Sequence, residues 1–210
     1  MSFRDRSDAG RKLAELLRPL ADHDVVVLAL PRGGLPVAAE VASALGAPLD
    51  VVVVRKLGVP RQPELAMGAV GEDGVVVWND DVRRVARVSD AEANDVLDRE
   101  SAEVARRAVW MRGQGEHRVP VGGRTAIVID DGIATGSTMT AACRIVRAHG
   151  AARIVVAVPV VAADVVTTLR READDVVAVS TPSRLSSVGG WYDDFTQVSD
   201  DEVRRLLAQS

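Results

Sequence analysis

The sequence predicts an α/β protein with an open, mainly parallel β-sheet and helices on both of its faces. Three observations favour this fold class. Short, largely apolar runs of the kind found in strands buried on both faces recur along the chain. Stretches whose apolar residues have helical spacing separate these runs, as expected for β-α-β crossovers. Polar residues directly follow three of the runs, where the carboxyl edge of a parallel sheet would lie.

Composition narrows the class of protein further. The chain has 210 residues, of which 47% are hydrophobic and 27% charged, with a net charge of −4. Acidic and basic residues are interspersed, which argues against the basic stripe of a nucleic-acid-binding protein. The first residues are charged and no apolar stretch approaches the roughly 20 residues of a membrane span. We therefore expect a cytoplasmic protein that binds neither nucleic acid nor a membrane.

The N-terminal part is predicted to alternate between helices and strands. Its elements are a helix over 8–20, a strand over 25–30, a helix over 35–45 that ends at Gly46, and a strand over 49–54. Proline and glycine then interrupt the pattern, so residues 57–81 are expected to be irregular. Within them, 67–70 and 75–78 could pair as a hairpin around 71–74.

The C-terminal part continues the alternation. Ser89 and Glu92 form a capping box that opens a long helix to about residue 112. The expected order after it is a loop over 113–123, a strand over 125–130, a helix over 137–149, a strand over 153–158, a helix over 162–172 and a strand over 175–180. A tail follows, with a helix that begins near Ser199.

Residues 126–139, AIVIDDGIATGSTM, are the most informative part of the chain. A predicted strand ends in Asp130 and Asp131, and a loop of small and hydroxyl residues leads into a helix. The backbone N–H groups of such a turn favour a phosphate dianion. The acids would repel that phosphate, so we expect them to face neutral hydroxyl groups, and together these groups describe a ribose 5-phosphate. The alternative is an ordinary strand–turn–helix in which both acids only start a turn.

This segment resembles the phosphoribosyl-diphosphate (PRPP) signature of the type I phosphoribosyltransferases. The resemblance implies that the 5-phosphate is bound by Ala134, Thr135, Gly136, Ser137 and Thr138. It further implies a single phosphoribosyltransferase domain over 1–210, with a core at about 24–180. The irregular segment 57–80 and the tail 181–210 would then form a small hood over the sheet edge.

The resemblance extends to two further loops. Arg32, Gly33 and Gly34 follow the first predicted strand and match the family's pyrophosphate loop, which implies a cis peptide bond between Pro31 and Arg32. Arg55 and Lys56 follow the second strand, where the family often places basic residues that contact pyrophosphate. The alternatives are a plain turn at 31–34 and a solvated strand end at 55–56.

The implied reaction moves ribose 5-phosphate from PRPP to a nitrogen nucleophile and releases pyrophosphate, a reaction of nucleotide metabolism. Asp130 and Asp131 would hold the ribose hydroxyls and favour an oxocarbenium-like transition state. Lys56 is the third expected catalytic residue, and with Arg32, Arg55 and Mg²⁺ it would stabilise the leaving pyrophosphate. Mg²⁺ would be held mainly by the substrate, without a protein cage.

The acceptor is a nucleobase or related heterocycle that the sequence does not identify. Hypoxanthine–guanine members carry an acid three or four positions after the acid pair, whereas this chain has Ile133, Ala134 and Thr135 around those positions. This departure argues against an oxopurine and removes the obvious general base. Glu64 is a speculative replacement, and a solvated loop carboxylate is its alternative interpretation.

Three aromatic residues, Trp191, Tyr192 and Phe195, gather in the tail. One of them could stack on the acceptor base. Alternatively, they pin the tail to the core or form a contact in a homodimer. Two other functions also stay open: a non-catalytic PRPP-binding regulatory protein, and a structural protein of the same fold.

Overall fold

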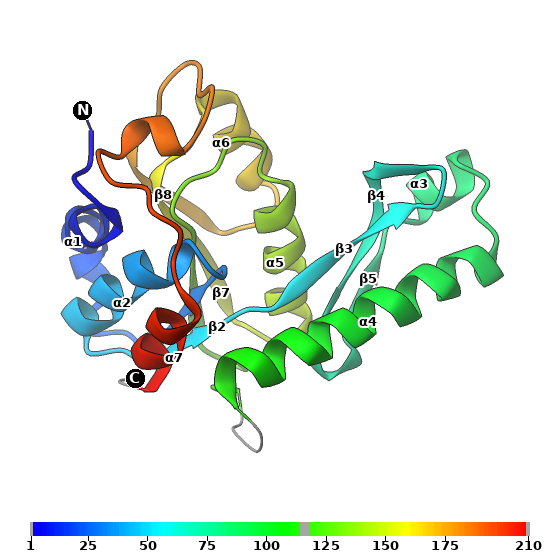
Figure 1. Ribbon diagram of the computed structural model, residues 1–210, viewed down its shortest axis with the longest axis horizontal. Helices are drawn as coiled ribbons and strands as arrows, with labels where there is room; N and C mark the ends of the chain where they lie inside the picture. The colour runs from blue at the N-terminus through cyan, green and yellow to red at the C-terminus, as the bar shows by residue number, and fades with distance from the viewer. Residues whose placement is uncertain (1, 114–117, 209–210) are drawn as a thin grey trace.

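A computed structural model describes residues 2–113 and 118–208 of the chain. In these residues the core is a five-stranded parallel sheet in the order β2-β1-β6-β7-β8 (Figure 1). The strands are β1 (Val25–Ala29), β2 (Leu49–Val51), β6 (Thr125–Ile129), β7 (Arg153–Val160) and β8 (Asp175–Ser180). The predicted α/β class with a parallel sheet is confirmed.

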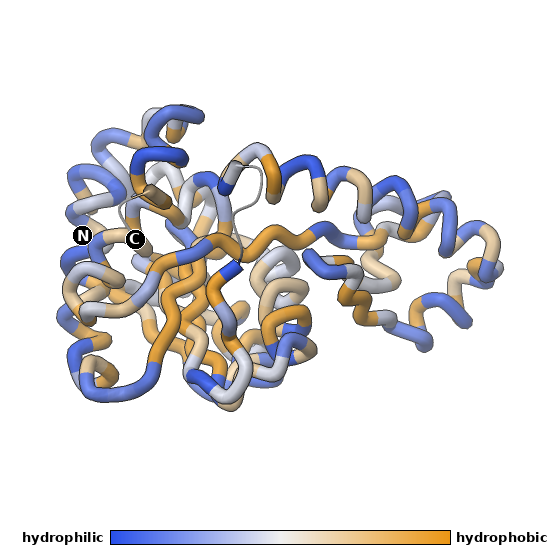
Figure 2. The backbone as a smooth tube through the Cα atoms, turned by 90° about the horizontal axis from the view of Figure 1, so that it is seen from below, coloured by the Kyte–Doolittle hydropathy of each residue, from blue (hydrophilic) through white to orange (hydrophobic). Residues whose placement is uncertain are grey.

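Helices cover both faces of this sheet. The helices are α1 (Arg6–Leu17), α2 (Gly34–Leu45), α5 (Ser137–Ala148) and α6 (Ala163–Leu169). Alternate residues of β1 point to opposite faces, because successive side chains in a strand do so. Val27 belongs to the apolar cluster that contains residues of α1 and α2, whereas Val26 belongs to the cluster that contains residues of α5 and α6. Every residue of β1 is buried, which explains its continuous apolar run. Figure 2 shows these strands as apolar segments among more polar helices.

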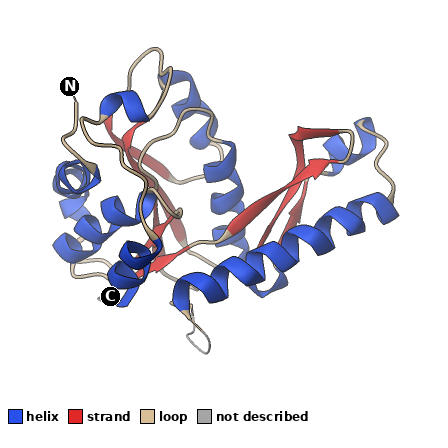
Figure 3. Cartoon of the chain, viewed as in Figure 1, coloured by secondary structure: helices blue, strands red, loops and turns tan. Residues whose placement is uncertain are grey.

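A second, antiparallel sheet extends away from the core together with a long helix (Figures 1 and 3). Its strands are β3 (Val54–Val59), β4 (Gln62–Gly71) and β5 (Val76–Trp78), and the helices beside it are α3 (Asp80–Val85) and α4 (Asp90–Arg112). We call residues 54–112 the arm. The predicted hairpin is confirmed, with Gly68 opposite Trp78 and Val70 opposite Val76.

Two sequence-based expectations are wrong in the arm. Residues 57–81 form strands and a short helix, so most of them are not irregular, and the strand predicted over 49–54 is split between β2 and β3. Two of the glycines that interrupted the pattern, Gly58 and Gly68, lie where backbones approach closely in the sheet. A Cβ atom at Gly58 would lie 2.5 Å from the Pro63 carbonyl oxygen, and one at Gly68 would lie 2.7 Å from the Val77 carbonyl oxygen.

The helix ends follow local side-chain chemistry. The capping box of Ser89 and Glu92 opens α4 as predicted. Helix α1 begins at Arg6 because the Asp5 carboxylate accepts from the Asp8 N–H at 2.7 Å, two residues before the predicted start. The chain continues through 3₁₀ turns at Arg18–Leu20, Glu72–Gly74 and Gly189–Trp191 and ends in α7 (Asp200–Ala208). Of the loop predicted over 113–123, residues 114–117 lie outside the described residues.

A buried ionic network joins the arm to the core sheet. Arg112 at the end of α4 donates to Asp50 of β2 at 2.6 Å and to the Val51 carbonyl oxygen at 2.7 Å. Its guanidinium group also pairs with Glu72, and the other Asp50 oxygen accepts from the Val119 N–H at 2.8 Å. The Arg112 and Asp50 side chains are only 7% and 4% exposed.

No helix in the described part of the chain is long and apolar enough to cross a membrane.

Candidate active site

The acid pair and the 31–34 loop meet at the carboxyl edge of the parallel sheet. Asp130 and Asp131 directly follow β6, and the loop follows its neighbour β1. A Cβ atom at Gly34 would lie 2.6 Å from the Ile129 carbonyl oxygen, and one at Gly33 would lie 2.1 Å from Oδ2 of Asp131. Only glycine fits these two positions, so the loop's backbone packs directly against the acids. The peptide bond between Pro31 and Arg32 is cis, as expected.

The loop at 134–138 leads into the N-terminus of α5. Gly136 has φ +77°, and no side chain makes a capping hydrogen bond to the start of the helix. Ala134, Thr135, Ser137 and Thr138 are exposed. The first N–H groups of α5 therefore face an accessible position where a helix terminus favours an anion.

Lys56 links the arm to this loop. The structure places Lys56 inside β3 rather than at the end of a core strand. Its Nζ nevertheless donates to Oγ of Ser137 at 3.2 Å. A cation of the arm and a hydroxyl of the 134–138 loop are thus neighbours, although 81 positions separate them in the sequence.

A cavity of about 230 Å³ lies between Pro31 of the 31–34 loop, Thr138 of the 134–138 loop and Lys56 of the arm. Its lining residues are Leu30, Pro31, Val52, Val53, Val54, Arg55, Lys56, Arg107 and Thr138. Sequence analysis missed Arg107, which reaches the cavity from α4. Arg107 and Glu103 have the i, i+4 spacing of an ordinary surface ion pair, so their pattern carries no signal of a site.

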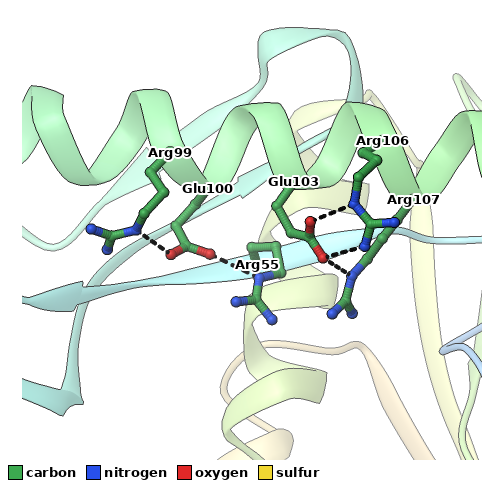
Figure 4. Close-up of polar contacts among 6 residues, drawn as sticks. All are labelled: Arg55, Arg99, Glu100, Glu103, Arg106 and Arg107. Atoms are coloured by element: carbon green, nitrogen blue, oxygen red, sulfur yellow. Dashed lines mark hydrogen bonds and ion pairs between the residues drawn. The ribbon is translucent and has the colours of Figure 1, made fainter.

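Several cations around this cavity are paired with acids of the same chain. Arg55 donates to Glu100 at 2.8 Å, and Glu103 accepts from both Arg106 and Arg107 (Figure 4). The hydrogen bonds from Arg106 and Arg107 lower the pKa of Glu103 to about 2. Arg32 pairs with Asp200 at 2.6 Å, and its guanidinium carbon lies 4.6 Å from the centre of the Trp110 ring.

A second cavity, of about 350 Å³, lies between the arm's first two strands and α4. It shares Arg55 and Lys56 with the first cavity, so the two are adjacent. Its remaining lining residues are Gly58, Val59, Pro60, Pro63, Glu64, Val96, Arg99 and Glu100. Glu64 is exposed and belongs to strand β4, not to a loop.

The two acids have different electrostatic surroundings. Burial, reinforced by the negative charge of Asp131, raises the pKa of Asp130 to about 8. Burial also raises the pKa of Asp131, but a hydrogen bond and the positive charge of Arg6 act in the opposite direction. Arg6 donates from Nε to Oδ2 of Asp131 at 2.8 Å. Sequence analysis did not identify Arg6.

The tail aromatics pack beside the acid pair. Tyr192 is buried, and its hydroxyl donates to the Asp131 carbonyl oxygen at 2.5 Å. Its ring lies 5.3 Å from that of Phe3 and 5.0 Å from that of Phe195, measured between ring centres. Trp191 packs against the same cluster. These contacts fit the interpretation that the aromatic residues pin the tail to the core, and stacking on a base stays a prediction.

Metal-binding side chains do not gather at this edge of the sheet. Within 2–113 and 118–208, no group of three or more His, Cys, Asp or Glu side chains could hold a metal ion. The acid pair supplies the hard oxygen donors that Mg²⁺ prefers, and a metal that is also bound by phosphates and water needs few protein ligands. The residues therefore fit an Mg²⁺ ion that enters with a phosphorylated substrate.

The fold and the arrangement of this site agree with a family assignment. Residues 6–195 match the family model described as "Phosphoribosyl transferase domain", so the chain belongs to this family. The predicted family is confirmed.

Individual relatives are similar over nearly the whole chain. "Putative phosphoribosyl transferase Rv0571c" of Mycobacterium tuberculosis H37Rv is 56% identical over 206 residues, which cover 98% of this chain and 46% of the relative. The counterpart MT0597 of strain CDC 1551 matches equally. The chain thus spans about half the length of these curated relatives. The crystal structure of TT1426 from Thermus thermophilus is 42% identical with a TM-score of 0.89, and the match covers 100% of this chain and 99% of that one.

Proposed function

We propose that this chain transfers the 5-phosphoribosyl group of PRPP to a nitrogen atom of a nucleobase or related heterocycle and releases pyrophosphate. One observation carries the proposal. The glycines of the 31–34 loop lie against the acid pair, while Lys56 reaches the 134–138 loop from the other side. A turn at a helix N-terminus, a pair of carboxyl groups and a cavity lined by cations thus lie at one edge of the sheet, which is the set of groups that PRPP would require.

The 5-phosphate would bind at the start of α5. The uncapped N–H groups after Gly136 and the hydroxyls of Thr135, Ser137 and Thr138 are donors suited to a dianion. The positive end of the helix dipole adds to this preference. Lys56 lies within reach of the same loop through Ser137.

The pyrophosphate would bind where the cations meet. Arg55, Lys56 and Arg107 line the cavity together with Pro31, and Arg32 follows Pro31 directly in the chain. Arg32 and Arg55 are now paired with Asp200 and Glu100, so they would exchange a carboxylate for a phosphate when substrate binds. Bound Mg²⁺ would neutralise charge on the leaving pyrophosphate, in addition to these side chains.

The acid pair would act on the ribose. Carboxylates at the end of β6 can accept hydrogen bonds from the two ribose hydroxyls. The negative charge of Asp131 would stabilise the positive charge that develops at the anomeric carbon in the transition state. Asp130, whose pKa is raised to about 8, would hold a ribose hydroxyl as the neutral acid. Asp131 is the better placed of the two to carry that charge, because Arg6 is its ion-pair partner.

The acceptor would enter the second cavity, between strands β3 and β4 and helix α4. This cavity adjoins the pyrophosphate region through Arg55 and Lys56, so a nitrogen of the acceptor could approach the ribose from it. Glu64 lines the cavity and is the nearest candidate for a group that takes up the proton. The proposal names a heterocycle as the class and leaves the individual base open.

The direct test is a panel of nucleobases and related heterocycles, incubated with the protein, PRPP and Mg²⁺, with pyrophosphate release as the readout. At least one acceptor should be consumed together with PRPP. Lys56→Ala should lower turnover more than PRPP affinity, whereas Arg61→Ala, which removes an arm cation that is 89% exposed, should change neither. Binding of PRPP without consumption of any acceptor would instead indicate a PRPP sensor. Absence of binding would contradict both functions.

A further inference from the structure

Arg6, near the N-terminus of the chain, contacts the acid pair although it lies outside every motif in the sequence. It is the first residue of α1, and 125 positions separate it from Asp131. We propose that Arg6 is a positioning residue of the phosphoribosyl site, which holds the Asp131 carboxylate oriented toward the ribose hydroxyls. This inference rests on the proposed function.

The contact between Arg6 and Asp131 is shielded from solvent and held by several other interactions. The Arg6 and Asp131 side chains are 11% and 13% exposed, so this pair is shielded far more than the surface ion pairs of the molecule. A second nitrogen of Arg6, Nη1, donates to the Thr196 carbonyl oxygen at 2.8 Å. The guanidinium carbon lies 3.9 Å from the centre of the Phe195 ring. Three partners therefore fix the direction of the Arg6 side chain.

Other acids near Arg6 are occupied by local bonds. Asp5 accepts from the Asp8 N–H as the cap of α1, and Asp194 accepts from both the N–H and the hydroxyl of Thr196. Asp131 is consequently the carboxylate with which the guanidinium group forms an ion pair. One of its oxygens, Oδ2, faces Arg6 and the backbone of Gly33. Arg6 therefore restrains Asp131 through Oδ2, and the proposal assigns Oδ1 to the substrate.

A partner of this kind solves a physical problem of the acid pair. Two adjacent carboxylates in a poorly solvated position disfavour each other's charge. A guanidinium group on Oδ2 lowers the free energy of the ionised form of Asp131 and restricts rotation of the carboxylate. A fixed charge stabilises a developing cation without reorganisation at the moment of reaction. Arg6 thus acts on the substrate through Asp131.

The test compares Arg6→Gln with Arg11→Gln. Arg11 lies on the same helix and pairs with Glu40 of α2 at 2.9 Å, so its substitution removes an ion pair of α1 without touching the acids. Arg6→Gln should lower kcat by about tenfold or more, while the KM for the acceptor stays within about twofold. Arg11→Gln should leave both constants within about twofold.

Two further variants separate charge positioning from a purely structural role. When Asp131→Asn is already present, adding Arg6→Gln should lower turnover by less than about threefold, because the carboxylate on which Arg6 acts has been removed. Arg6→Lys, which keeps the charge but not the planar fork, should retain more activity than Arg6→Gln. Equal losses in the Lys and Gln variants, or full additivity with Asp131→Asn, would overturn the proposal. If the Arg6→Gln variant unfolds below the assay temperature, kcat is compared between the wild type and the Arg6→Lys variant instead.

The wild-type protein distinguishes failure of this inference from failure of the proposed function. A wild type that neither binds PRPP nor turns it over contradicts the proposed function. An active wild type whose Arg6→Gln variant has an unchanged kcat contradicts only the role of Arg6. If the wild type binds PRPP without turnover, the same comparison is made on PRPP affinity, where Arg6→Gln should bind about tenfold more weakly and Arg11→Gln like wild type.

Discussion

At the scale of single residues, the acid pair costs stability. Burial and a neighbouring negative charge disfavour the ionised form of a carboxyl group in the folded protein. At any pH where the same group ionises freely in the unfolded chain, this difference lowers the stability of the fold. Asp130 is such a group, with a pKa raised to about 8. A side chain that reduces stability in this way at the edge of a sheet is typical of a functional position.

This cost gives a testable pH dependence. In the folded protein Asp130 keeps its proton up to about pH 8, whereas in the unfolded chain it ionises near its ordinary value of 3.8. The folded wild type therefore loses stability as pH rises between about 4 and 8, and Asp130→Asn removes this loss. The amide oxygen can still accept the Asp131 N–H, as Oδ1 of Asp130 does at 2.9 Å.

We expect Asp130→Asn to be more stable than wild type by about 1–3 kcal/mol at pH 8, with the difference shrinking toward pH 4. Chemical denaturation at several pH values measures it. Asp175→Asn is the matched control, because Asp175 makes the same bond to the next N–H, at 2.8 Å, in an exposed position. A difference in unfolding free energy between wild type and Asp130→Asn that does not change with pH would contradict the raised pKa of Asp130.

The sequence was informative where function and local structure use neighbouring residues. Asp130, Asp131 and the 134–138 loop lie within one segment, so their spacing revealed the site. Arg6 and Arg107 reach it from distant helices, and contacts across such distances leave no pattern in a single sequence. The partners of Arg32 and Arg55, Asp200 and Glu100, could not be predicted for the same reason.

At the scale of secondary structure, the start of α5 combines a glycine in the left-handed conformation with an open anion position. Gly136 adopts φ +77°, which favours glycine, and a Cβ atom there would lie 2.8 Å from Val165. Gly46 has φ +61° at the end of α2, but a Cβ atom there would have no other atom within 4 Å. An alanine would adopt an unfavourable backbone conformation at either position, but only at Gly136 would its Cβ atom also clash with a neighbouring residue.

Alanine substitutions at both glycines test the loop. Each should reduce stability by about 1 kcal/mol through the left-handed backbone conformation. Gly136→Ala should additionally weaken PRPP binding, because the displaced loop no longer directs its N–H groups at the phosphate, while Gly46→Ala should bind normally. Calorimetric titration measures this, and equal PRPP affinity in the two variants would argue against a phosphate site at α5.

The arm shows why element type is harder to predict than the core. Strands of the parallel sheet are buried on both faces and reveal themselves by continuous apolar runs. The first residues of β4 are exposed, and both β3 and β4 contain glycines at positions of close backbone approach. In a sequence, those glycines and prolines cannot be distinguished from the glycines and prolines that mark a loop.

At the scale of the whole molecule, the candidate site depends on how the arm is held against the core. Lys56 and Arg107 belong to the arm, whereas the acids and the 134–138 loop follow strand β6 of the core sheet. The Arg112 network joins the two parts, and α5 adds an apolar contact through Ala141 and Ile145 to Ala69 of β4. The geometry of the cationic cavity therefore depends on buried contacts away from it.

Arg112→Met tests this dependence. It leaves Asp50 and Glu72 buried without their cation, so we expect a loss of about 3–5 kcal/mol in unfolding free energy. Arg106→Met, which removes an ion pair with Glu103 on the exposed side of α4, should change stability little. Denaturant titration of both variants checks this, and similar stabilities would show that the network does not hold the arm.

The central claim is that the acids, the loop at α5 and the arm's cations together form a PRPP site. Calorimetric titration of PRPP with Mg²⁺ into wild type and into Asp131→Asn tests this claim most directly, with melting temperatures as the control for folding. We predict one PRPP site per chain in the wild type, and binding weaker by about tenfold or more in a folded Asp131→Asn variant. Absence of PRPP binding in the wild type, or equal affinity in the two proteins, would contradict it.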